Sequence, residues 1–109
     1  MKANINRLSA VFKLLAEPSR LRILLNLGLE CRPVSAIIAG TGLSQTNVSF
    51  HLRALREAGL VRGEKHGSFV FYCLPDPQLL EHIQGLAGWL EERAAGAEEE
   101  TLIERVAGG

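Results

Sequence analysis

The segment between residues 35 and 74 most constrains the fold of this chain, because its hydrophobic period changes from helical to strand-like. Residues 35–40 predict a short helix with Ser35 as its N-cap, followed by a tight turn that contains glycine. Ser44 is suited to cap a longer helix over residues 45–58. The segment therefore begins with two helices separated by a short turn.

Two short strands are predicted after these helices. Residues 60–65 and 69–74 are separated by a turn, and the second run is rich in β-branched and aromatic side chains. In the longer helix, Val48, Leu52 and Leu55 have the spacing of a buried stripe. The order helix, turn, helix and β-hairpin is typical of a winged helix-turn-helix.

Further helices are expected on both sides of this segment. Apolar residues at spacings of three and four predict a helix over residues 5–15, and Pro18 suits the first turn of a second helix that ends near residue 29. Asp76 is expected to cap a last helix that has Pro77 in its first turn. The second helix would carry Leu21, Leu24 and Leu25 together with the basic Arg20 and Arg22.

The net charge of zero hides an uneven distribution of charge. Residues 1–74 carry ten Lys or Arg and four acidic residues, whereas residues 75–109 carry two and eight. A basic front part of this kind favours a nucleic-acid partner. Hydrophobic residues make up 47% of the chain, yet no run is long enough to span a membrane and no signal peptide is recognisable. We therefore expect a cytoplasmic protein with no membrane partner.

The first half of the helix over residues 45–58 carries short polar side chains. A winged helix-turn-helix presents this half to the major groove of DNA, where Gln and Asn pair with adenine. The alternative is an ordinary polar helix face on a helical domain. The residues expected to contact DNA are Ser44, Gln45, Thr46, Asn47, Ser49 and His51 on the helix, with Arg53, Arg62, Lys65 and His66 facing phosphates.

Two separated motifs give a more specific indication. The sequence LLAEPSRLRIL spans residues 14–24, and GLSQTNVSFHL at residues 42–52 is followed by LREAGLV. Together they resemble the opening signature and the recognition helix of the ArsR/SmtB family of bacterial winged helix-turn-helix repressors. The resemblance implies a homodimer that binds double-stranded DNA at an imperfect palindromic operator and leaves it when a small inducer binds.

The expected architecture follows from the pattern and the resemblance together. The fold is expected to be mainly α with a two-stranded β-wing, and the resemblance implies dimerisation through the first and last helices. Residues 1–94 would form the DNA-binding and dimerisation domain. Residues 95–109 would form an acidic C-terminal tail or a short helix.

The residues that sense metals in this family are not matched here. Where many members carry Cys-x-Cys before the short helix, this chain has Pro33-Val34-Ser35. Gln78 and Trp89 stand where other members place zinc-binding histidines on the last helix. We therefore expect no metal site and no cofactor, and the inducer stays unidentified.

Cys31 and Cys73 are the remaining candidates for sensing. In many winged helices the segment before the short helix pairs with the second wing strand, which would make these cysteines neighbours. A thiol pair there suits redox, polysulfide or soft-metalloid chemistry. The alternative is two unrelated cysteines that act as small hydrophobic residues.

Other classes of function are also open. The chain has no Cys-x-x-Cys, no glycine-rich phosphate loop and no nucleophile with a base, so we expect no enzyme. A winged helix used only for protein contacts is one alternative. A constitutive regulator, or one that responds to an organic ligand and has structural cysteines, is the other.

Overall fold

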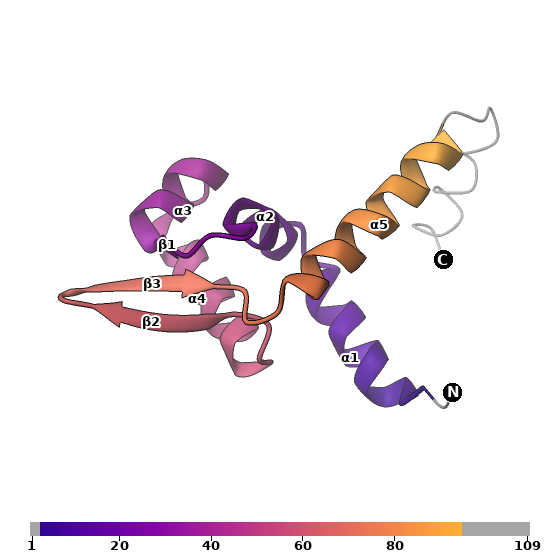
Figure 1. Ribbon diagram of the computed structural model, residues 1–109, viewed down its shortest axis with the longest axis horizontal. Coiled ribbons are helices and arrows are strands. Elements are labelled where there is room, and N and C mark those ends of the chain that lie inside the picture. Colours follow the sequence, from indigo (N-terminus) through magenta and orange to yellow (C-terminus); the bar gives the residue numbers. More distant parts are fainter. Residues whose placement is uncertain (1–2, 95–109) are drawn as a thin grey trace.

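The computed structural model describes residues 3–94, which form a helical body with a β-hairpin at one end and two diverging helices at the other (Figure 1). The elements in chain order are α1 (Ile5–Leu15), α2 (Pro18–Leu27), β1 (Arg32–Pro33), α3 (Val34–Thr41), α4 (Gln45–Glu57), β2 (Arg62–His66), β3 (Phe69–Cys73) and α5 (Pro77–Ala94). This is a winged helix-turn-helix, as the sequence predicts. The acidic stretch over residues 95–109, expected as a tail or short helix, lies outside the described residues.

The core forms where α2, α3 and α4 turn apolar side chains towards one another. The predicted stripe of α4 is confirmed. On α2, Leu24 is buried, whereas Leu25 is 49% exposed. Since α2 packs against both α3 and α4, its neighbours decide which of its side chains are buried. The fully buried side chains are Ile23, Leu24, Leu27, Ile37, Val48, Leu52, Leu55 and Val61.

Side-chain caps define where the helices begin. Ser44 Oγ accepts a hydrogen bond from the N–H three residues further on at 3.1 Å, and Asp76 Oδ1 accepts one from the N–H two residues further on at 2.9 Å. These two predicted caps are confirmed. The predicted cap at Ser35 is wrong, because α3 begins at Val34 and extended Pro33 precedes it with no side-chain cap. The backbone is already extended in β1, so the helix starts directly after the strand.

The sheet has one strand more than the two expected from the sequence. The strand order is β1-β3-β2, and both pairings are antiparallel. In the added pairing Arg32 lies opposite Tyr72, and Pro33 lies opposite Phe71. The pairing of this segment with the second wing strand, on which the expected proximity of Cys31 and Cys73 depended, is therefore confirmed. A two-residue strand that contains proline has little strand signal of its own, so the sequence did not predict it as a separate strand.

The helices α1 and α5 expose apolar side chains. No residue of α1 is buried, and Phe12 is 54% exposed. On α5, Leu86, Trp89 and Leu90 are all exposed. In the range 3–94 no helix is both long and apolar enough to cross a membrane.

The contact between Gly40 and Asn26 generates a stability prediction. A methyl group at Gly40 would collide with the Asn26 amide, whose Oδ1 is buried and has no hydrogen-bond partner among residues 3–94. Ala normally stabilises a helix by about 1 kcal/mol relative to Gly, whereas overpacking costs about 1–3 kcal/mol. Gly40→Ala is therefore expected to lower the free energy of unfolding, as measured by urea denaturation. In an Asn26→Ala background the same change should raise it, and a stabilising Gly40→Ala in the wild type would contradict the close packing.

Candidate nucleic-acid interface and cysteine pair

The turn between α3 and α4 holds the second helix at a defined angle to the first. Gly42 adopts a left-handed conformation with φ of 73°, and its N–H bonds the carbonyl of Ile38 at 2.9 Å. The Thr41 hydroxyl donates to the carbonyl of Ile37 at 2.7 Å and accepts from the N–H of Leu43 at 3.3 Å. These bonds satisfy the end of α3 and let the chain turn directly into the capped start of α4.

The start of α4 presents polar side chains to solvent. Val48 and Leu52 are buried, and every residue of α4 before Val48 is exposed. The side chains of Gln45, Thr46, Asn47 and Ser49 are therefore accessible to a macromolecule that approaches this face. Ser44 is exposed too, but its hydroxyl oxygen already accepts the capping hydrogen bond.

His51 and Arg53 of α4 have partners within the chain. The Nε–H of Arg20 on α2 donates to His51 Nδ1 at 3.2 Å, so the imidazole is half-buried between the two helices. Arg53 Nε donates to Glu57 Oε1 one turn further along at 3.1 Å. Arg53 keeps most of its side chain exposed, whereas His51 contributes to packing.

Phe50 is a candidate that the sequence reasoning missed. Its side chain is 62% exposed on α4, and its ring lies edge-on to His51 with centroids 5.2 Å apart. A large apolar residue outside the buried stripe of a helix is a detectable signal in the sequence. Phe50 has no polar group that could read a base edge, and the expected contacts were all polar.

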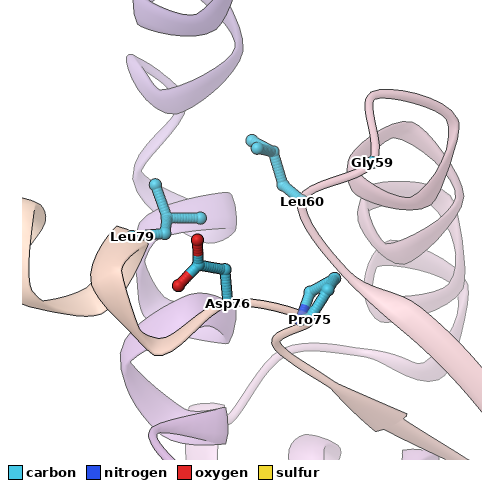
Figure 2. A pocket seen from close by; sticks show the side chains of 5 residues that line it. All are labelled: Gly59, Leu60, Pro75, Asp76 and Leu79. Carbon is cyan, nitrogen blue, oxygen red and sulfur yellow. The ribbon is translucent and has the colours of Figure 1, made fainter.

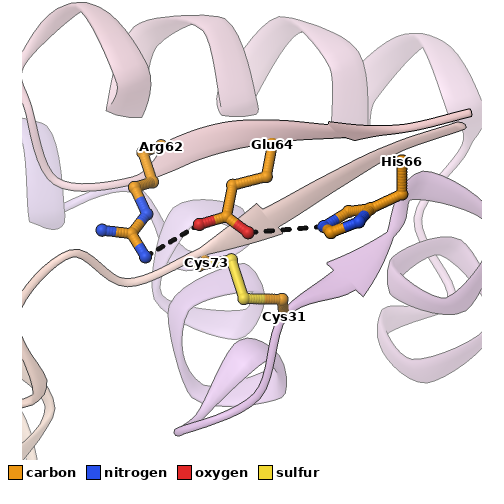
Figure 3. The surroundings of a disulfide bond; sticks show 5 residues. All are labelled: Cys31, Arg62, Glu64, His66 and Cys73. Carbon is orange, nitrogen blue, oxygen red and sulfur yellow. Dashed lines mark hydrogen bonds and ion pairs between the residues drawn. A yellow bond between two sulfur atoms is a disulfide. The ribbon is translucent and has the colours of Figure 1, made fainter.

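The basic side chains of the wing differ in whether they contact an acidic residue. Arg62 Nη2 lies 2.8 Å from Glu64 Oε1, and His66 Nε2 lies 3.4 Å from Glu64 Oε2, so one carboxylate contacts both side chains (Figure 3). Lys65 is exposed and lies on the opposite face of β2, because successive strand residues alternate. It has no ion-pair partner among residues 3–94.

The structure joins Cys31 and Cys73 in a disulfide. Their Cα atoms are 4.4 Å apart, because β1 pairs with β3 immediately beside them. Cys73 is 3% exposed, whereas Cys31 is open to solvent. Glu64 lies over the same sulfurs, and the Sγ atoms and one of its carboxylate oxygens are all within 4.8 Å of one another (Figure 3).

A small pocket of about 180 Å³ lies where the end of α4 meets the start of α5 (Figure 2). Asp76 points into this region, but its Oδ1 is the cap of α5. Sites for drug-sized ligands are usually larger, at about 300–1,000 Å³. The pocket therefore offers little room for an inducer. Its lining residues are Gly59, Leu60, Pro75, Asp76 and Leu79.

Comparisons with known proteins agree with this geometry. A helix-turn-helix domain family matches residues 15–64. The transcriptional regulator NmtR of Mycobacterium tuberculosis is 36% identical over 75 residues, which are 69% of this chain and 62% of that protein. A transcriptional repressor SmtB homolog of Synechocystis is 33% identical over 79% of this chain and 65% of its own. The chain thus spans just under two thirds of each of these relatives.

Solved structures extend the match to almost the whole fold. The crystal structure of Rv0081 from Mycobacterium tuberculosis has a TM-score of 0.70 and 32% identity, covering 85% of this chain and 99% of that one. The homodimeric winged helix-turn-helix DNA-binding domain of Mb0332, a possible ArsR-family regulator of Mycobacterium bovis, has a TM-score of 0.69 and 29% identity. It covers 80% of this chain and 88% of that one. The chain therefore belongs to the ArsR/SmtB family of winged helix-turn-helix transcriptional regulators.

Proposed function

We propose that the protein is a DNA-binding transcriptional repressor that acts in the cytoplasm and has no catalytic activity. The observation that carries the proposal is the exposed polar start of α4, held outward by a fully buried apolar stripe. Such a helix enters the major groove of DNA with its N-terminal residues against the base edges. The exposed Lys65 on the wing, which has no ion-pair partner among residues 3–94, adds a cation that suits a phosphate.

The proposed contacts fall into two groups. On α4, Gln45, Thr46 and Ser49 read base edges, and Phe50 packs against a thymine methyl group. The wing and the second half of α4 approach phosphates, which position the protein without reading sequence. The residues proposed to contact DNA are Ser44, Gln45, Thr46, Asn47, Ser49, Phe50 and His51, together with Arg53, Arg62, Lys65 and His66.

We propose that residues 1–94 form one unit that dimerises through α1 and α5. Both helices expose large apolar side chains, with Phe12 54% and Trp89 47% exposed. The homodimeric state of the Mb0332 domain supports this arrangement. A two-fold dimer of this kind reads two half-sites about 34 Å apart on an imperfect palindrome.

The cysteine pair is proposed as the inducer site. A protein that binds DNA in the cytoplasm is in a reducing compartment. A disulfide in that compartment is typically transient and regulatory. An oxidant such as a peroxide or polysulfide takes two electrons from the Cys31 and Cys73 thiols, two protons leave and the S–S bond forms. The exposed sulfur of Cys31 is accessible to such a reagent. The alternative is a structural disulfide in a regulator that is constitutive or responds to an organic ligand.

Replacing a base-reading residue and a phosphate-contacting residue should have different effects. Gln45→Ala is expected to cost about 1–3 kcal/mol on the preferred operator and to relax sequence preference. Lys65→Ala should weaken binding to all duplexes alike and reduce the salt slope by about 1. Fluorescence anisotropy at several salt concentrations measures both. Unchanged specific binding by Gln45→Ala would contradict the placement of α4 in the groove.

The contact of Phe50 can be tested by removing either partner. Phe50→Ala is expected to weaken operator binding about tenfold, in the range of one lost base-specific contact. Replacing the contacted thymine by uracil, which lacks the methyl group, should weaken the wild type but not Phe50→Ala. The matched control is Leu29→Ala, which removes a 79% exposed apolar side chain outside α4. If the wild type and Phe50→Ala lost the same affinity on uracil DNA, Phe50 would not contact the thymine methyl group.

Reagents that modify thiols should release the protein from DNA. The reduced protein is expected to bind its operator, and treatment with polysulfide or arsenite should weaken binding at least about tenfold, a change of 1.4 kcal/mol. Cys31→Ser should bind equally well before and after treatment. Fluorescence anisotropy on the DNA upstream of the gene measures the change. If the treated and untreated wild type gave identical binding curves, the disulfide would have a structural role and not a sensing one.

A further inference from the structure

Cys31 and Cys73 form a cluster with a third potential metal ligand, the carboxylate of Glu64. One ligand atom from each residue lies within 4.8 Å of the other two, and the three residues come from or adjoin three different strands. The register explains the grouping. Cys73 on β3 lies opposite Arg62 on β2, so Glu64, two residues along, projects from the same face of the sheet.

We infer that the reduced form of this cluster binds a thiophilic divalent cation of the Zn²⁺ class at the base of the wing. The inference builds on the proposed function, because it names a ligand for the same cysteine pair. A dithiol reduces the disulfide and is itself oxidised to a cyclic disulfide, which leaves two protein thiols. Binding of the cation then displaces two protons and forms two metal–sulfur bonds and one bond to the Glu64 carboxylate.

The ligand set favours this class of cation over others. Thiolates are soft ligands that select zinc and related ions, whereas Mg²⁺ and Ca²⁺ require oxygen ligands throughout. Two sulfurs and one carboxylate oxygen leave one position of a tetrahedron open. The side chain at hand for this position is His66, whose Nε2 is 3.4 Å from Glu64 Oε2.

The surroundings of the cluster also suit a bound ion. Cys73 is buried, which limits access of water to one side, while the exposed Cys31 can rotate away from it to reach the wider sulfur separation of a metal site. Glu64 and Cys73 lie on the paired strands β2 and β3, and Cys31 directly precedes β1, which pairs with β3, so the sheet holds the backbone on or beside which all three residues lie. Preorganised ligands on rigid elements bind metal with less loss of conformational freedom.

Metal binding at this position would change the charges of the wing. Glu64 now contacts both Arg62 and His66, and a carboxylate that shares its negative charge with a bound cation attracts these two side chains less strongly. Arg62 would then become available for a phosphate, at a position already proposed to face DNA. The oxidised and metal-bound forms would therefore present different wings to the same operator.

The test is a titration of reduced protein with Co²⁺ in the absence of DNA. Protein is reduced with a dithiol, the dithiol is removed without air, and Co²⁺ is added and then displaced with Zn²⁺. The expected result is thiolate-to-cobalt charge-transfer absorption that saturates at one ion per chain and disappears when Zn²⁺ is added. The oxidised protein should show none of this absorption, because its sulfurs are bonded to each other.

Variants assign the ligands. Glu64→Gln should keep the thiolate absorption but lose at least about tenfold in Co²⁺ affinity, since removal of even an outer-shell partner of a ligand costs about ten- to a hundredfold. Glu57→Gln removes a carboxylate on α4, away from the cluster, and should bind like the wild type. Cys31→Ser changes an exposed residue and should retain its fold by circular dichroism while losing one thiolate contribution. Absence of the absorption in the reduced wild type, or equal affinity in Glu64→Gln and the wild type, would overturn the inference.

The outcome separates this inference from the proposed function. A reduced protein that binds operator DNA but no Co²⁺ would leave the repressor intact and remove the metal site. A protein that binds Co²⁺ with the expected variant pattern but no DNA would support the metal site and contradict the proposed repressor.

Discussion

Burial of Val48, Leu52 and Leu55 against α2 and α3 is the constraint on which the other features of the molecule depend. Complete burial of one such side chain stabilises a fold by about 1.5–3 kcal/mol. Any rotation of α4 about its axis would expose these side chains and lose this energy. The outward direction of Gln45, Thr46, Ser49 and Phe50 is therefore a consequence of the core. A surface that reads DNA needs such a fixed direction, because its side chains must meet particular base edges.

Pairing of β1 with β3 connects this helical core to the wing. The pairing brings the chain from the end of α2 alongside the last wing strand and leads directly into α3. It also places Cys31 against Cys73 and leaves Glu64 over the sulfurs. A chemical change at the sulfurs thus occurs on the sheet that carries Arg62 and His66. No long-range relay is needed between the cysteine pair and the proposed phosphate contacts.

Candidate residues on α4 could be named from the sequence, but their partners could not. The buried stripe at helical spacing determines which residues of α4 face outward, so the exposed positions of Gln45 and Thr46 follow from local pattern alone. The contact of His51 with Arg20 joins residues on different helices, and helical spacing carries no information about it. Phe50 was not among the expected contacts, because only polar side chains of this helix were considered for base recognition. Glu64 was not singled out, since one acidic residue in a basic strand has the pattern of an ordinary surface residue.

The sequence by itself determined the order of the elements, the caps at Ser44 and Asp76, and the apolar stripe of α4. Each of these depends on residues within about one or two helical turns of each other, where spacing and side-chain type are sufficient. Tertiary structure decided the third strand, the start of α3, the buried side of α2 and the cluster around the disulfide. Cys31 and Cys73 are 42 residues apart in sequence, and Glu64 reaches them only through the strand register. Such groupings depend on which strands and helices pack together, and that is set by burial of the whole core.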